Sequence, residues 1–399
     1  MKKLRVGILF GGRSGEHEVS LLSAASVFKA IDKNTYDVVP IGITKEGHWV
    51  TAADAERLLR GEFSHHAERH LRAGDPETTP AAAVLANGQA VLVPPEPQQS
   101  GALKAFQTDA SSHALARRVS DRAINVDIVF PVLHGTFGED GTIQGLLELA
   151  DMPYVGAGVL GSAAGMDKDI MKSLFRAAGL PIVKHVTILR GDWQANPRKI
   201  ERLVQSKLKY PVFVKPANLG SSVGISKAHS QKELGAAIRE AARFDRKIIV
   251  EEGVGGKKQK AREIECSVLG NDRPEASIPG EIVPSKEFYD YDAKYLDEGS
   301  ELIIPARLNK PQIRKVQQIA IAAFKAVDCS GLARVDFLMD PKRRRIYLNE
   351  INTMPGFTAI SMYTKLWAAS GLSYPQLIER LIQLGLERHQ DKKKNQYSR

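Results

Sequence analysis

The sequence has only two cysteines and lacks long apolar runs. Cys266 and Cys329 stand alone in 399 residues, and their apolar contexts are typical of buried thiols in a reducing compartment. No apolar stretch reaches the length that a membrane-spanning helix needs. The N-terminal apolar run at 6–10 is stopped by glycines and is too short for a secretion signal. These absences predict a cytoplasmic protein with no disulfide, no cysteine-bound metal and no membrane partner.

The sequence also lacks the Gly-x-x-x-x-Gly-Lys-Ser/Thr pattern, which excludes a Walker phosphate loop. Its net charge of +10 suggests nucleic-acid binding at first sight. However, residues 388–399 hold five basic residues and one acidic residue, and a second basic run at 342–345 follows the turn-forming pair Asp340 and Pro341. A solvated tail and a hairpin tip therefore explain much of the charge. We expect no nucleic-acid partner, since anionic small substrates explain a basic protein equally well.

The length and the order of the patterns predict an α/β protein of two or three domains. A buried strand, LRVGILF, is followed by a glycine-rich turn and a helical pattern, and two further strands read DVVPIGI and VDIVFPVLHG. This order predicts a Rossmann-like parallel sheet in the N-terminal domain, with ligands at the carboxyl ends of its strands. Residues 52–122 have weak periodicity, and we interpret them as an insertion with partial helix.

A predicted β-hairpin near the C-terminus, LARVDFLMDPKRRRIYLNEINT, carries polar residues on one face. Arg334 and Asp336 share a face of its first strand, and Glu350 and Asn352 share a face of its second. Paired in register, they place three oxygen ligands beside one guanidinium, a donor set that suits Mg²⁺. The alternative is a structural ion pair from Arg334 to Asp336 or Glu350. Asn352 and the glycine turn that follows it favour the metal.

A magnesium ion held in this way indicates a nucleotide, and two other segments offer groups for its phosphates. In VKPANLGSSVGISK, Lys215 ends a strand and Ser221 and Ser222 lie in a tight glycine-rich hairpin. The small residues of such a hairpin let backbone N–H groups approach phosphate oxygens. Lys168, in GMDKD, stands at the start of a predicted helix. The alternative is an ordinary turn with two surface lysines.

Together these motifs resemble the D-alanine–D-alanine ligases, which are members of the ATP-grasp superfamily. The matching stretches are GILFGGRSGEHEVSLLSA, LHGTFGEDGTIQGLLELADMPYVGAGV, SAAGMDKDIMK, VKPANLGSSVGISK, FYDYDAKYL, GLARVDF and NEINTMPGFT. They occur in the same order as in that family and span most of the chain outside 52–122. The combination of GGRSGEHEVS with YDYDAKY is the specific part of the match, because ARVDF alone fits other ATP-grasp ligases.

The resemblance implies a three-domain ATP-grasp fold and a reaction. The implied divisions are an N-terminal α/β domain at 1–156, a central ATP-grasp domain at 157–251, a C-terminal catalytic ATP-grasp domain at 252–387 and a basic tail at 388–399. ATP would phosphorylate one D-alanine to D-alanyl phosphate, and the amine of a second would attack it to give the dipeptide used in peptidoglycan. The expected partners are D-alanine and ATP, and the expected assembly is a homodimer.

Two other functions stay open at this point. One is a different ATP-grasp carboxylate–amine ligase that makes D-Ala–D-Ser or D-Ala–D-lactate, and the other is a non-catalytic nucleotide-binding regulator. The resemblance favours an amide product, because the lid position Tyr295 is a neutral phenol. A cationic residue there would repel a second ammonium group and favour a hydroxy acid. The presence of all four polar hairpin residues argues against the regulator.

The resemblance also implies which side chains bind the amino acids and perform the reaction. Glu18 would hold the ammonium group of the first D-alanine and would be linked across the closed site to Ser221 and Tyr295. Arg334 and the backbone N–H of Gly356 would stabilise the tetrahedral oxyanion. The residues implied near the substrate carboxylates are His134, Ser361 and Met362. For Glu18 the alternative is a carboxylate that complements a helix N-terminus.

The implied nucleotide and metal ligands come from the central and C-terminal parts of the chain. The residues implied for ATP are Lys168, Lys215, Ser222 and Lys294 near the phosphates, Glu251, Glu252 and Val254 around adenine, and Glu263 at the ribose. Lys294 belongs to a long loop at 285–300 that would act as a lid. The residues implied for two Mg²⁺ ions, or for Mn²⁺ in their place, are Asp336, Glu350 and Asn352.

Overall fold

The chain folds into two compact units. The computed structural model describes residues 3–51, 79–87, 89–92, 102–107, 118–255, 260–283 and 301–397. The first unit comprises Met1–Val159, Met354–Thr364 and Gly371–Arg399, and the second comprises Leu160–Thr353 and Lys365–Ser370. The predicted lid residues Lys294 and Tyr295 lie outside the described residues. Among the helices that are described, none has the length and apolar content required to span a bilayer.

The first unit is built around three parallel strands, as the sequence predicts. The strands β1 (Leu4–Gly11), β2 (Tyr36–Ile43) and β7 (Ile128–Pro131) pair in the order β2-β1-β7. Strand β1 is buried along most of its length because it is central in the sheet. The predicted α/β class and the parallel N-terminal sheet are therefore confirmed.

The described parts of 52–122 contain strands that the sequence pattern did not reveal. The sheet continues antiparallel from β2 through β3 (Trp49–Thr51), β4 (Gln89–Leu92), β5 (Ala102–Gln107) and β6 (Arg118–Asn125). The expected partial helix is present as α3 (Pro80–Asn87). The inserted segment thus extends the sheet beyond β2. Its strands were not expected because they are short or lack regular alternation of apolar and polar residues.

Helices and an aromatic cluster complete the first unit. Helix α1 (His17–Ala30) packs against β1, and the remaining helices of this unit are α4 (Thr142–Leu149) and α13 (Tyr374–Lys392), with the start of α12 (Met362–Ala369). Phe357 is fully buried and its ring contacts those of Phe130, Tyr363 and Tyr374 at centroid distances of 5.5–5.9 Å. The hydroxyl of Tyr374 also donates to the carbonyl of Phe357 at 2.7 Å. These contacts anchor the segment after the hairpin to the first unit.

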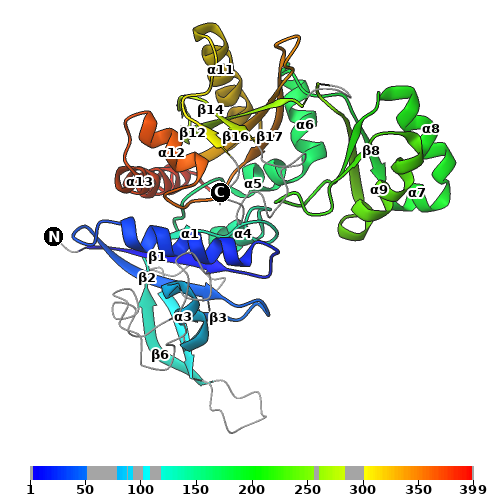
Figure 1. The fold of residues 1–399 in the computed structure, drawn as a ribbon. Helices are drawn as coiled ribbons and strands as arrows, with labels where there is room; N and C mark the ends of the chain where they lie inside the picture. Colours follow the sequence, from blue (N-terminus) through cyan, green and yellow to red (C-terminus); the bar gives the residue numbers. More distant parts are fainter. Residues whose placement is uncertain are drawn as a thin grey trace, which may run out of the picture. The chain divides into compact units, whose positions relative to one another are not determined.

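One sheet of the second unit is a four-stranded antiparallel sheet covered by helices. Its order is β10-β9-β11-β8, formed by β8 (His185–Leu189), β9 (Val212–Pro216), β10 (Ser226–Ala228) and β11 (Lys247–Glu252). The helices of this part are α7 (Arg190–Ala195), α8 (Pro197–Lys207) and α9 (Gln231–Phe244) (Figure 1). Apolar residues of these helices and strands form one buried core cluster.

The other sheet of the second unit contains the predicted hairpin. Its strands are β12 (Arg262–Gly270), β13 (Glu275–Ala276), β14 (Gly280–Val283), β15 (Glu301–Ile303), β16 (Gly331–Met339) and β17 (Ile346–Asn352). Strands β16 and β17 pair antiparallel around the Asp340 turn, as expected. The helices of this part are α5 (Val159–Met166), α6 (Lys168–Ala177) and α11 (Lys310–Ala326). The division into three domains at 156/157 and 251/252 stays a prediction.

The glycine-rich turn after β1 is fixed by a close backbone approach and by one buried serine. Gly11 has φ +86°, and a Cβ there would lie 2.2 Å from the carbonyl oxygen of Ile43, so only glycine fits. The N–H of Gly11 donates to Oγ of Ser20 at 2.9 Å, and this hydroxyl donates to the carbonyl of Val132. Ser20 is fully buried. It therefore joins the ends of two parallel strands.

Replacing this serine tests the contribution of the link. In Ser20→Ala, the N–H of Gly11 and the carbonyl of Val132 lose their buried partner, and we expect the free energy of unfolding to fall by about 1–3 kcal/mol. The exposed Ser206→Ala is the control and should change stability by less than about 0.5 kcal/mol. Urea denaturation followed by circular dichroism measures both. Equal stabilities of the two variants would contradict the role given to Ser20.

Candidate active site

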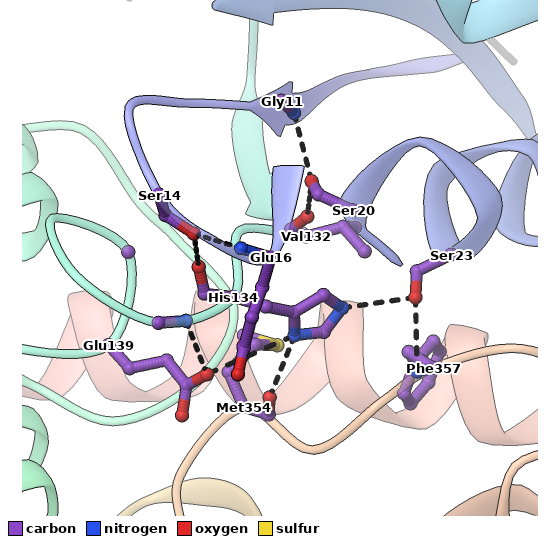
Figure 2. Close-up of polar contacts among 12 residues, drawn as sticks. Gly11, Ser14, Glu16, Ser20, Ser23, Val132, His134, Glu139, Met354 and Phe357 are labelled. Carbon is purple, nitrogen blue, oxygen red and sulfur yellow. Dashed lines mark hydrogen bonds and ion pairs between the residues drawn. The ribbon is translucent and has the colours of Figure 1, made fainter. Parts of the chain in front are cut away.

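His134 lies at the centre of a buried polar cluster in the first unit (Figure 2). Its Nδ1 is 3.0 Å from the carbonyl oxygen of Met354, and its Nε2 is 3.0 Å from Oγ of Ser23. Because a carbonyl only accepts, Nδ1 carries the proton and Nε2 accepts from Ser23. Ser23 in turn accepts from the N–H of Phe357 at 3.3 Å. The neutral ring therefore uses both nitrogens to hold the backbone of residues 354–357.

Glu16 places a carboxylate beside this histidine. The residue is 7% exposed, and one oxygen or nitrogen atom each of Glu16, His134 and Glu139 lie within 4.8 Å of one another. Glu139 accepts from the N–H of Gly135 at 2.8 Å. In the part of the chain that the structure describes, the carboxylate of Glu16 has no hydrogen bond or ion pair. A buried carboxylate without a cation is costly, so the cluster suits an added ammonium group.

A metal ion fits this cluster less well than an ammonium group does. Nδ1 of His134 carries a proton that it donates to Met354, and the lone pair of Nε2 accepts from Ser23, so neither nitrogen is open to a metal. An ammonium group needs only acceptors, and the carboxylate of Glu16 supplies one.

Glu18, the residue expected at the ammonium group, lies elsewhere. It belongs to the first turn of α1, its side chain is 39% exposed, and it accepts a hydrogen bond from Nζ of Lys45 at 2.5 Å. Partial burial favours a higher pKa for Glu18, but the hydrogen bond from Lys45, a backbone hydrogen bond and the nearby positive charge together outweigh it and lower the pKa. The structure thus brings Glu16, rather than Glu18, to His134. Glu16 precedes the helix in the glycine-rich turn, and this position at a strand end was the signal that could have identified it.

Three other predicted residues lie close together on the segment that His134 holds. The hydroxyl of Ser361 accepts from the N–H of Thr358 at 3.1 Å, and a Cβ on Gly356 would lie 3.4 Å from it. Met362 begins α12 and is 6% exposed. Gly356, Ser361 and Met362 therefore share one short segment of the first unit with the contacts to His134.

The predicted phosphate-binding residues of the second unit meet at one loop. Nζ of Lys168 donates to the carbonyl of Leu219 at 2.6 Å, at the start of the Gly-Ser hairpin. Within that hairpin, Ser221 and Ser222 have φ values of +48° and +60°. Such left-handed conformations are costly for residues other than glycine and are found mainly at functional sites. Their arrangement in a tight turn supports the expectation of a phosphate-binding loop.

Glu251 has a different environment from the one expected. Its carboxylate is 3% exposed and lies 2.7 Å from Nζ of Lys215 and 2.8 Å from Nζ of Lys172. Burial alone would raise the pKa of Glu251, but the two lysines hold it well below its usual range. The side chain is therefore engaged in ion pairs, and only its backbone is available to frame a base. Lys172 had no predicted role.

The other residues expected around adenine and the ribose lie at the end of β11 and on β12. The carboxylate of Glu252 accepts from the N–H of Lys209 at 3.2 Å, and its own N–H donates to the carbonyl of Lys184. Val254 follows the end of β11 and is half-buried. Glu263 lies on β12 and interacts electrostatically with Lys215.

The hairpin brings its four predicted polar residues together in the expected register. Arg334 lies opposite Asn352, and Asp336 lies opposite Glu350. The guanidinium of Arg334 donates to both oxygens of Asp336 at 2.8 and 2.7 Å, and the amide of Asn352 donates to Asp336 at 3.0 Å. The structural ion pair considered as the alternative is thus present. It does not exclude a metal, since Asp336, Glu350 and Asn352 carry oxygen atoms on the same face of the hairpin.

The structure adds a carboxylate that the sequence analysis missed. Glu265 on β12 lies opposite Asp336, is 6% exposed, and has an oxygen 3.0 Å from Nε of Arg334. Arg334 is therefore held between two carboxylates. The sequence feature that could have identified Glu265 is the alternation in REIEC, which places Glu263 and Glu265 on one face of a strand.

Comparison with known proteins agrees with this geometry. The family model described as "D-ala D-ala ligase N-terminus" matches residues 5–157, and that described as "D-ala D-ala ligase C-terminus" matches residues 174–383. The chain belongs to the D-alanine–D-alanine ligase family. A relative named D-alanine–D-alanine ligase from Natranaerobius thermophilus is 46% identical over 396 residues, which cover 99% of this chain and 98% of the relative.

Solved structures give the same result for the fold. The D-alanine–D-alanine ligase from Coxiella burnetii superposes with a TM-score of 0.77 at 37% identity, covering 99% of this chain and 97% of the other. The VanG D-Ala:D-Ser ligase from Enterococcus faecalis superposes with a TM-score of 0.78 at 36% identity, covering 96% and 100%. These similarities confirm the resemblance on which the predicted family, ATP-grasp fold and ligase class rest.

The protonation state of His134 predicts how stability depends on pH. Burial lowers the pKa of His134, although Glu16 opposes the shift. In the unfolded chain the ring takes up a proton below its ordinary pKa of about 6.5, whereas in the folded state it stays neutral to a lower pH. The free energy of unfolding is therefore highest above about pH 6.5 and decreases as the pH falls below that value.

Comparison with a residue that does not titrate isolates this effect. We expect wild type to lose about 1 kcal/mol relative to His134→Gln as the pH falls from about 7.5 to about 5.5. Guanidinium denaturation at several pH values measures the difference. A difference that stays constant with pH would contradict a neutral His134.

Proposed function

We propose that this protein is an ATP-dependent D-alanine–D-alanine ligase that forms the dipeptide through D-alanyl phosphate, for peptidoglycan synthesis. The observation that carries the proposal is the buried carboxylate of Glu16, which has no cationic partner among the described residues and lies beside His134 in a member of this ligase family. An amino acid supplies the missing ammonium group. Phosphorylation of its carboxylate supplies a leaving group that a free carboxylate lacks.

The residues of the first unit take binding and orienting roles in this proposal. Glu16 takes the place of Glu18 as the residue that binds the ammonium of the first D-alanine. His134 stays neutral and positions the backbone of 354–357, so that the N–H of Gly356 is presented as an oxyanion donor. Ser361 and the backbone of Met362 bind the carboxylate of the second D-alanine.

The residues of the second unit hold the nucleotide. Lys168, Lys215 and the hairpin of Ser221 and Ser222 bind ATP phosphates, together with Lys294. The backbone of 251–254, which includes Glu252 and Val254, frames adenine, because the side chain of Glu251 is engaged by lysines. Glu263 binds the ribose. Arg334, already positioned by Glu265 and Asp336, stabilises the negative charge that develops in the transition state.

The metal ligands are Asp336, Glu350 and Asn352. Their oxygens share one face of the hairpin and form the hard donor set that Mg²⁺ or Mn²⁺ prefers. Two such ions would neutralise charge on the phosphates. Asp336 accepts from Arg334 through both oxygens and from Asn352 through Oδ2, so a bound metal would replace part of these contacts.

The proposal also includes the remaining properties expected from the sequence. They are a cytoplasmic location, a homodimer, three domains, and a link from Ser221 to Tyr295 over the bound substrates. The alternative in which the second substrate is D-serine gains weight from the similarity to the VanG D-Ala:D-Ser ligase. The neutral phenol of Tyr295 still favours an amide product over D-Ala–D-lactate.

Phosphate release with different amino acids tests the function. Wild type with ATP, Mg²⁺ and D-alanine should release phosphate and form the dipeptide, whereas L-alanine should give neither. Arg334→Ala should lose about 3–4 kcal/mol of transition-state stabilisation, as expected when an oxyanion donor is removed. Arg343→Ala, at the exposed tip of the same hairpin, is the matched control. Faster product formation with D-serine or D-lactate as second substrate would assign the alternative, and activity with L-alanine alone would contradict the proposal.

The choice between Glu16 and Glu18 can be tested with two isosteric variants. Glu16→Gln removes the buried negative charge, and we expect the KM for D-alanine to rise by at least about tenfold, equivalent to ~1.4 kcal/mol. Glu18→Gln removes a half-exposed charge that Lys45 already pairs, and a much smaller change is expected. Steady-state kinetics measures both. A larger rise in Glu18→Gln would return the ammonium site to Glu18.

A further inference from the structure

Lys172 is one of the most deeply buried charged side chains in the second unit. It lies on α6 and is 1% exposed. Its Nζ donates to the carbonyl of Asn349 at 2.8 Å and lies 2.8 Å from one oxygen of Glu251. Burying an ammonium group in this way is costly unless its partners compensate the charge. The partners of Lys172 therefore indicate what its buried charge does.

The partner Glu251 also binds Lys215, which is the lysine expected at the ATP phosphates. The second oxygen of Glu251 lies 2.7 Å from Nζ of Lys215. Without Lys172, Glu251 and Lys215 would form a neutral pair that offers little attraction for phosphate. With Lys172, the three side chains carry a net charge of +1. Lys172 thus offsets the negative charge that holds Lys215 in place.

The backbone contact of Lys172 reaches the strand of the metal ligands. Asp336 pairs with Glu350 and Phe337 pairs with Leu348, so Asn349 is the extra residue of a β-bulge. The carbonyl of this bulged residue accepts the hydrogen bond from Lys172. Glu350, the next residue, is near enough to interact electrostatically with both Lys172 and Lys215. One ammonium group therefore joins the phosphate-binding lysine to the hairpin.

We propose that Lys172 is a positioning residue that neutralises Glu251, so that Lys215 is held in place and yet presents its positive charge to the nucleotide phosphates. The inference rests on the proposed function, because it requires a nucleotide at Lys215. Glu251 holds the ammonium group of Lys215 in position, and Lys172 compensates the negative charge of Glu251. This arrangement explains why the strand end carries a carboxylate between two lysines at a site for an anion.

The proposal makes a charge-based prediction for binding, without catalysis. Lys172→Met leaves the neutral pair of Glu251 and Lys215, and we expect the affinity for ADP to fall by at least about tenfold. Adenosine carries no phosphate, so its affinity should be unchanged. In Lys172→Met/Glu251→Gln the net charge returns to +1 on Lys215, and most of the lost ADP affinity should return. Isothermal titration calorimetry measures these affinities.

The controls separate charge from folding. Lys232→Met removes an exposed positive charge from α9 in the same unit and should bind ADP as wild type does. Weak ADP binding by the double variant, equal to that of Lys172→Met, would overturn the inference in favour of a packing role. So would equal ADP binding by Lys172→Met and wild type. If wild type bound neither ADP nor adenosine, the proposed function itself would fail, and with it the inference.

Discussion

The register between β16 and β17 is the constraint on which the candidate site of the second unit depends. Because Asp336 lies opposite Glu350 and Arg334 lies opposite Asn352, all four side chains project from one face. A shift of one residue would turn Glu350 and Asn352 to the other face and would separate them from Arg334 and Asp336. The bulge at Asn349 comes directly after these pairs, and it frees a carbonyl for Lys172 without disturbing them.

Charge compensation distinguishes a binding group from a structural one in this molecule. Glu251 is buried and paired twice, so it supports its neighbours and offers its side chain to no ligand. Glu16 is also buried but has no cationic partner among the described residues, and the ammonium group of the proposed substrate would compensate it. Two glutamates with similar burial thus have different charge environments. The difference is set by whether lysines on neighbouring strands and helices reach them.

The sequence predicted those parts of the fold and site that depend on local pattern. The parallel strands β1, β2 and β7 and the β16–β17 hairpin follow from buried runs, alternation and turn residues, and they place Asp336 and Glu350 correctly on one face. Strands β4, β5 and β6 were missed because β4 and β5 are short and lack regular alternation, and because β6 is mostly polar.

The site residues that were missed depend on tertiary contacts or on small differences in position. Glu16 and Glu18 are two residues apart, and only the start of α1 at His17 decides which one faces His134. Lys172 and Glu265 act through residues of other strands and helices, so no local pattern reveals their roles. Propensity and spacing describe one element at a time, whereas these contacts arise from packing between elements.

The most direct test of the central claim is a crystal structure with a non-hydrolysable ATP analogue and Mn²⁺, with the metal located by its anomalous scattering. The claim is that the polar face of the hairpin binds a divalent cation next to nucleotide phosphates. We predict anomalous peaks ligated by oxygens of Asp336, Glu350 and Asn352, with a phosphate oxygen in the same coordination shell. A bound nucleotide with no peak at these side chains, and Asp336 still paired with Arg334 and Asn352, would contradict it.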